Sequence, residues 1–170
     1  MTFGIGESVM ATVRNPARGQ QIWYQPGPLT TILGRALGGR IGRASGGWDI
    51  GITKVHLFPS PIFTSLKMPD SLSVVTFHRD EVWELPVNAE VLAWSDKTGV
   101  EMFRYGSHIM GIQGHPEYTK DILLHLIDRL FNRELIEESI AAEAKTKAAG
   151  SEPDREAWKK LCTAFLKGKL

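Results

Sequence analysis

The chain has 170 residues, of which 42% are hydrophobic and 23% are charged, and its formal net charge is +1. This composition is typical of one globular domain with a substantial core, and the near-neutral charge excludes binding to nucleic acid or a membrane surface through overall charge. Because Cys162 is the single cysteine, an internal disulfide is excluded as well, and we expect a cytoplasmic protein without a membrane-spanning segment.

The first part of the chain has few periodic apolar positions. Residues 1–28 contain the turn-forming runs NP and PGP, and we predict a loop or poorly ordered chain there. Residues 31–37 have the apolar spacing of a short helix, which should end at Gly38 because glycine is favoured just beyond a helix end. A glycine-rich connector up to Gly51 is predicted to follow.

Short runs with partial alternation of apolar and polar residues come next, each bounded by proline, glycine, asparagine or aspartate. Such runs are typical of strands. We predict five of them, at residues 51–58, 72–77, 90–94, 100–105 and 108–112. A tight turn is predicted between the third and the fourth, at Lys97-Thr98-Gly99, which makes that pair antiparallel.

The apolar period changes to that of helices in the last part of the chain. Residues 122–131 place apolar side chains three and four positions apart, with Thr119 as the expected N-cap. A second helix is predicted over residues 134–149, with fraying in the polar segment 142–152, and a third helix starts near Pro153. The third helix has one apolar face, formed by Trp158, Leu161, Cys162, Phe165 and Leu166. Strands followed by helices predict an α/β fold.

The most informative motif is the run GIQGHPE at residues 111–117, which holds His115 and Glu117 two positions apart. A nucleophile activated by histidine needs a third group that orients the ring, so these side chains form two thirds of a catalytic triad. The sequence offers no matching nucleophile. Cys162 lies on the apolar face of a predicted helix, where a thiol behaves as a small hydrophobe, and no Gly-x-Ser-x-Gly motif is present.

A second polar cluster, HRDEVWELP at residues 78–86, follows an apolar strand at a point where side chains can project into a cleft. We select His78 and Asp80 as its candidate site residues. Together with His115 and Glu117 they have the side chains of metal ligands, but neither pair has the His-x-x-x-His spacing of a helical zinc site. We therefore expect neither a metal nor another cofactor.

The motif GIQGHPE resembles the closing motif of class I glutamine amidotransferases. Three further stretches resemble the plant gamma-glutamyl peptidase branch: ILGRALGG at residues 32–39, HRDEV with LP at residues 78–86, and the tail at residues 158–168. The resemblance covers residues 31–170, so we expect an atypical N-terminal segment at residues 1–30 and then the C-terminal portion of a glutamine amidotransferase-like domain. The implied fold is part of a flavodoxin-like, three-layer α/β domain with C-terminal helices.

The resemblance also implies a reaction and roles in it. In the family, a cysteine on a Gly-x-Cys-x-Gly-x-Gln elbow attacks a gamma-glutamyl amide, forms a thioester and releases glutamate on hydrolysis. In the plant branch the substrates are glutathione conjugates. The resemblance makes His115 the general base and Glu117 the carboxylate that orients its ring. It places His78 and Asp80 in the site that holds the gamma-glutamyl group.

The elbow is the part of the family pattern that this sequence lacks. An ungapped alignment places Gly27 at the cysteine position and Thr31 at the glutamine position, so we expect a truncated and inactive relative of gamma-glutamyl peptidases. Two alternatives stay open: a non-catalytic module that binds a small gamma-glutamyl ligand or a partner subunit, and a metal-dependent hydrolase. A sheet without its first strands has unpaired edges, so a protein partner that completes the sheet is also expected.

Overall fold

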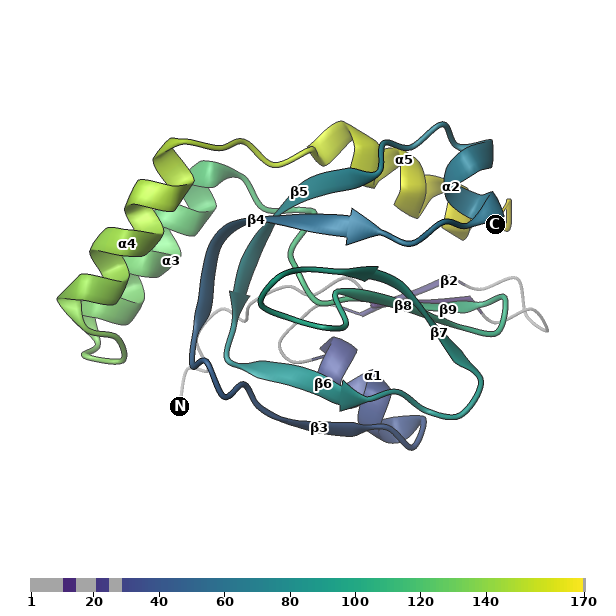
Figure 1. Cartoon of the computed structure of the whole chain (residues 1–170), viewed down its shortest axis with the longest axis horizontal. Coiled ribbons are helices and arrows are strands. Elements are labelled where there is room, and N and C mark those ends of the chain that lie inside the picture. The colour runs from purple at the N-terminus through teal and green to yellow at the C-terminus, as the bar shows by residue number, and fades with distance from the viewer. Residues whose placement is uncertain (1–10, 15–20, 25–28, 170) are drawn as a thin grey trace.

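The computed structural model describes residues 11–14, 21–24 and 29–169 (Figure 1). The strands are β1 (Ala11–Arg14), β2 (Gln21–Tyr24), β3 (Arg40–Arg43), β4 (Asp49–Leu57), β5 (Ser71–His78), β6 (Asp80–Glu84), β7 (Ala89–Trp94), β8 (Met102–Tyr105) and β9 (Ile109–Ile112). The helices are α1 (Leu29–Ala36), α2 (Pro61–Ser65), α3 (Lys120–Asn132), α4 (Glu138–Ala149) and α5 (Arg155–Leu166). Within the described ranges, the strands form a seven-stranded sheet and a separate ribbon of β3 and β6.

The large sheet has the strand order β2-β1-β9-β8-β7-β4-β5, and the neighbouring strands pair antiparallel. The sheet curls, because the chain just after β9 returns to β5 at the far edge of the sheet. There His115 forms a single bridge with Val75, and its backbone N–H donates to the Val75 carbonyl over 2.7 Å. The curl therefore brings the end of the GIQGHPE run against β5.

Helices cover both faces of the sheet. Val74 belongs to a core that β5 shares with α2 and α5, whereas Val75 belongs to a second core shared with α3 and α4. Successive residues of a strand point to opposite faces, so these two cores lie on the two sides of β5. Figure 1 shows α1 on the other side of the sheet from α2 and α5, and Thr30 Oγ1 donates there to the Ile112 carbonyl over 2.7 Å. The predicted α/β class is confirmed.

Most of the predicted elements are present. The five predicted strands correspond to β4, β5, β7, β8 and β9, and the predicted helices to α1, α3, α4 and α5. The turn at Lys97-Thr98-Gly99 lies between β7 and β8, which pair antiparallel as predicted. Thr119 is the N-cap of α3, and its side chain accepts a hydrogen bond from the N–H of Ile122 over 3.4 Å.

Three predictions about individual elements are wrong. The loop predicted over residues 1–28 contains β1 and β2, which extend the sheet beyond β9; residues 1–10, 15–20 and 25–28 lie outside the described residues. The glycine-rich connector contains β3, whose pairing with β6 is long-range. The helix α4 stays regular to Ala149 because small side chains pack it into the core it shares with α3, namely Ala141, Ala144 and Ala148.

The outer edge of β5 is covered by the start of α5. The N–H of Ser73 donates to Asp154 Oδ2 over 2.7 Å. The Ser73 carbonyl accepts from the N–H of Asp154 over 2.9 Å and from Trp158 Nε1 over 3.0 Å. At these positions the backbone groups of the edge are satisfied within the chain, and the expected partner that completes the sheet stays a prediction.

Candidate functional site

Gly114 allows the GIQGHPE run to approach β5 closely. A Cβ atom at this position would lie 2.8 Å from a Val74 methyl carbon and 3.0 Å from the Val75 carbonyl oxygen. Real Cβ atoms do not approach a neighbour this closely, so a side chain here would push the run away from β5. The glycine thereby sets the position of the following residue, His115.

We expect Gly114→Ala to lower the free energy of unfolding by about 1–3 kcal/mol, because the added methyl group overpacks the contact with β5. Urea denaturation measures this change, and the ring resonances of His115 should shift at the same time. The control is Gly99→Ala, where no heavy atom lies within 4 Å of the added Cβ and a change within about 0.5 kcal/mol is expected. Equal losses in the two variants would contradict the packing argument.

The structure brings His115 and Glu117 together as predicted. The Nδ1–H of His115 donates to Glu117 Oε1 over 3.1 Å. The His115 side chain is 1% exposed, and its ring stacks on Tyr118 with centroids 4.2 Å apart and planes 6° from parallel. A proton on Nδ1 leaves a lone pair on Nε2, which is the arrangement of a general base whose ring is oriented by a carboxylate.

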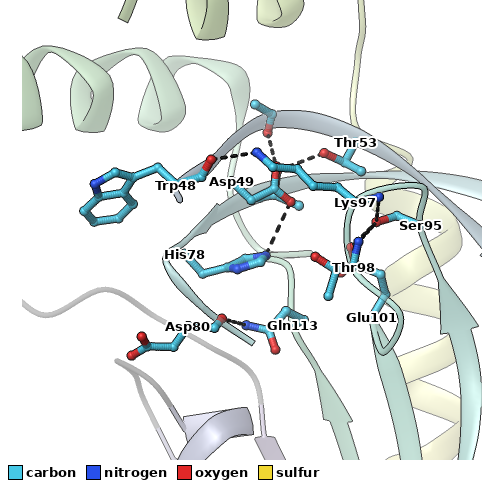
Figure 2. Close-up of polar contacts among 12 residues, drawn as sticks. Trp48, Asp49, Thr53, His78, Asp80, Ser95, Lys97, Thr98, Glu101 and Gln113 are labelled. Carbon is cyan, nitrogen blue, oxygen red and sulfur yellow. Dashed lines mark hydrogen bonds and ion pairs between the residues drawn. The ribbon is translucent and has the colours of Figure 1, made fainter. Parts of the chain in front are cut away.

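His78 lies at the end of β5 with a side chain that is only 10% exposed. Its Nε2 lies 3.6 Å from Asp49 Oδ2 (Figure 2). Burial lowers the pKa of His78; the negative charge of Asp49 and the backbone of Asp80 oppose this, whereas the electrostatic effects of His115 and Lys97 add to it. His78 is therefore neutral at pH 7, and it lies close enough to His115 to interact with it electrostatically.

Asp80 begins β6 and directs its carboxylate away from His78 (Figure 2). Its Oδ1 lies 3.2 Å from Nη1 of Arg43, on the neighbouring strand of the ribbon. Its backbone carbonyl accepts a hydrogen bond from Nε2 of Gln113 over 3.1 Å. Asp80 is thus joined to the GIQGHPE run through its main chain and not through its carboxylate.

Sequence reasoning missed an acidic cluster beside these residues. Asp49 at the start of β4 and Glu101 just before β8 are 5% and 2% exposed. The hydroxyl of Ser95 donates to Glu101 Oε1 over 2.7 Å. Burial raises the pKa of Glu101 to about 7; the Ser95 hydrogen bond opposes the shift and the charge of Asp49 adds to it. The sequence does not reveal that Asp49 and Glu101 are buried, because acidic residues next to apolar strands are also common on protein surfaces.

The described residues contain neither a metal-binding group of side chains nor a membrane-spanning helix. No three His, Cys, Asp or Glu side chains of this part of the chain are grouped so as to hold a metal ion. Glu117 is engaged by His115 and Asp80 by Arg43, so the four residues considered as a metal set do not converge. None of the described helices is long and apolar enough to cross a membrane.

Cys162 is buried on α5 and lines a cavity of about 350 Å³ together with Pro116, Glu117 and Trp158, among others. Burial raises the pKa of its thiol to about 12, and the negative charge of Glu117 contributes to the rise. Because the thiolate is the nucleophilic form, this raised pKa disfavours Cys162 as a nucleophile at neutral pH. Gly27, at the position of the family cysteine, lies outside the described residues, and Thr31 lies in α1.

Curated relatives share most of the described chain. It is 46% identical to gamma-glutamyl peptidase 5 and 43% identical to gamma-glutamyl peptidase 3, both from Arabidopsis thaliana, over 142 residues in each case. Each match covers 81% of this chain and 57% of the relative. The chain therefore spans a little over half the length of these relatives.

Solved structures share the fold. A glutamine amidotransferase from Thermotoga maritima matches with a TM-score of 0.60 at 21% identity, over 81% of this chain and 59% of that chain. A glutamine amidotransferase from Methylobacillus flagellatus gives the same TM-score at 15% identity, which confirms the fold expected from the resemblance. The sequence model of the family described as glutamine amidotransferase class-I matches residues 31–130. The chain belongs to the class I glutamine amidotransferase family.

Proposed function

We propose that this chain is a gamma-glutamyl peptidase-like protein in which His115 is the base of the reaction site and Glu117 orients it. The observation that carries the proposal is the hydrogen bond between His115 Nδ1 and Glu117 Oε1, in which the carboxylate accepts and orients the ring as in a catalytic triad. The similarity to two plant gamma-glutamyl peptidases supports the same assignment.

The proposed ligand is a gamma-glutamyl amide such as a glutathione conjugate, held next to His78 and Asp80. Neutral His78 can exchange a hydrogen bond with an uncharged amide, and it lies in the same region as His115. Asp80 contributes its main chain, which Gln113 fixes through the hydrogen bond to the Asp80 carbonyl. A small-molecule ligand agrees with a buried polar site better than an extended nucleic-acid partner does.

We further propose that these 170 residues bind the gamma-glutamyl compound without hydrolysing it on their own. The family reaction needs a thiolate, and burial raises the pKa of the single cysteine to about 12, so its thiol stays protonated at pH 7. Removing the nucleophile of a triad reduces the turnover rate by several orders of magnitude. A cytoplasmic location and the boundary between residues 1–30 and 31–170 stay predictions of the sequence.

An assay of glutamate release from S-hexylglutathione tests the proposal, with a plant gamma-glutamyl peptidase as the positive control. We expect no turnover above the buffer rate from the purified chain, and saturable binding of the conjugate by calorimetry. Glutamate release that His115→Gln abolishes would overturn the claim of binding without hydrolysis. Absence of any binding at millimolar conjugate would overturn the assigned ligand class.

A further inference from the structure

Three charged or polar side chains from distant segments form a line that ends at His78 (Figure 2). Lys97, in the turn between β7 and β8, places its Nζ 3.1 Å from Asp49 Oδ1. The other oxygen of Asp49, at the start of β4, lies 3.6 Å from His78 Nε2. Lys97 Nζ also donates to the Trp48 carbonyl over 2.6 Å, so the ammonium group is held from two sides.

The burial of this line is uneven. The side chains of Asp49 and His78 are 7% and 10% exposed, whereas that of Lys97 is 43% exposed. A buried carboxylate is costly unless a cation or several hydrogen bonds stabilise it, and Lys97 supplies the cation from the surface. The ion pair therefore holds the Asp49 side chain in place next to His78.

A purely structural histidine in such a place would have both ring nitrogens hydrogen-bonded. By distance and angle, neither nitrogen of His78 makes a hydrogen bond with a described residue, although the Asp80 backbone approaches the ring and raises its pKa; Asp49 Oδ2 makes none either. The distance of 3.6 Å between Asp49 Oδ2 and His78 Nε2 is too long for a hydrogen bond. The Asp49 carboxylate therefore orients the ring through its charge and leaves the ring nitrogens without a hydrogen-bond partner. The ring is thus held in place while its hydrogen-bonding capacity stays available.

We propose that Asp49 and Lys97 are positioning residues for His78, with Asp49 fixing the neutral ring as the Nε2–H tautomer and Lys97 holding Asp49. The Asp80 carbonyl could also accept the ring N–H, and it raises the pKa of His78. This carbonyl is uncharged, however, and it already accepts a hydrogen bond from Gln113. A full negative charge attracts the ring N–H more strongly than a carbonyl dipole does. This inference rests on the proposed role of His78 in the gamma-glutamyl site.

The charged groups that face His78 predict how its pKa changes when Asp49 or Lys97 is replaced. Burial has the largest effect on the pKa of His78 and lowers it. Asp49 raises this pKa, whereas His115 and Lys97 lower it further. Asp49→Asn should lower the pKa of His78 further, and Lys97→Met should raise it. A residue that only stabilised the fold would not move the pKa of His78 in opposite directions in these two variants.

The experiment reads the ring of His78 by NMR in the chain labelled with nitrogen-15 at histidine. Long-range proton–nitrogen correlations identify the tautomer of the unmodified chain, and pH titrations follow Asp49→Asn, Lys97→Met and the control Lys54→Met on the exposed side of β4. We expect the Nε2–H tautomer and opposite shifts in the two test variants, with no shift in the control. An Nδ1–H tautomer in the unmodified chain, or shifts in the same direction, would overturn the inference.

Ligand affinity provides a second readout. Residues that orient a binding group through contacts behind it typically change affinity by about 10- to 100-fold when removed. We therefore expect at least about tenfold weaker binding of S-hexylglutathione by both test variants, and unchanged binding by Lys54→Met. Unchanged affinity in both test variants would overturn the positioning role. The NMR measurement of the His78 tautomer requires no ligand. If the unmodified chain fails to bind S-hexylglutathione, the proposed function is refuted, and the tautomer measurement still decides the inference about Asp49 and Lys97.

Discussion

Replacing Trp158 by alanine is expected to lower the free energy of unfolding by about 3–5 kcal/mol, the usual cost of removing a buried tryptophan. Trp158 is 1% exposed and belongs to the core that joins the sheet to α2 and α5. Its Nε1 also donates to the Ser73 carbonyl over 3.0 Å, so truncation leaves an acceptor on the edge of β5 without this partner. The variant combines a cavity with a lost hydrogen bond.

Urea denaturation followed by circular dichroism measures this loss. Trp158→Phe keeps most of the ring volume and removes the hydrogen bond, so a smaller loss of about 1–2 kcal/mol is expected. Trp83→Ala is the matched control, because that ring is 55% exposed and its loss should cost about 1 kcal/mol or less. A cost for Trp158→Ala no larger than that of Trp83→Ala would show that α5 does not anchor the sheet.

The second large effect concerns Glu101 and pH. The pKa of Glu101 in the folded chain is about 7, above its ordinary value of 4.5, because burial disfavours the charged form. A group whose pKa is raised by folding stabilises the fold below its unfolded pKa, and this contribution is lost as pH rises through the folded value. The unmodified chain should therefore lose about 3 kcal/mol of stability between pH 4.5 and pH 8 from this group.

Glu101→Gln removes this dependence, since an amide stays neutral and its oxygen can still accept from Ser95. We expect the variant to be about 2–3 kcal/mol more stable than the unmodified chain at pH 8, and nearly equal to it at pH 4.5. Urea denaturation at both pH values measures the difference. The control Glu138→Gln changes an exposed side chain on α4 and should alter neither value by more than about 0.5 kcal/mol. A constant difference between the Glu101 variant and the unmodified chain at both pH values would refute the buried charge.

Elements with a local signal could be predicted from the sequence. The apolar period of α3 and its cap at Thr119 are properties of neighbouring residues, and so are the turn residues between β7 and β8. The strands β1 and β3 lack such a signal because distant strands stabilise them. Gly42 illustrates the difference: the ring of Trp83 on β6 lies where a Cβ atom would be, a contact that the neighbours of Gly42 in the sequence do not reveal.

The candidate site divides in the same way. His115 and Glu117 are two residues apart, so their pairing could be predicted from the motif and its family resemblance. The line from Lys97 through Asp49 to His78 could not, because Asp49 lies opposite His78 only once β4 pairs with β5, and Lys97 reaches Asp49 from the turn between β7 and β8. Asp80 shows a further limit, since the sequence indicates a polar residue at the site but not that its carboxylate turns to Arg43.

The curl of the sheet determines where His115 lies. The return of the chain from β9 to β5 places His115 against Val75 on the edge strand β5, four positions from β9 in the strand order. Gly114 makes this return sterically feasible, and Glu117 and Tyr118 then hold the imidazole ring from two sides. The backbone contact with β5 orients the imidazole before any ligand arrives, which is what the proposed role of His115 requires.

The central claim is that the region of His115 and His78 recognises a gamma-glutamyl group. The most direct test titrates the histidine-labelled chain with S-hexylglutathione, and in parallel with the S-hexyl cysteinylglycine that lacks the gamma-glutamyl group. We predict saturable changes in the ring signals of both histidines with the first compound and none with the second at equal concentration. Identical responses to the two compounds, or no response of either histidine to the conjugate, would contradict the claim.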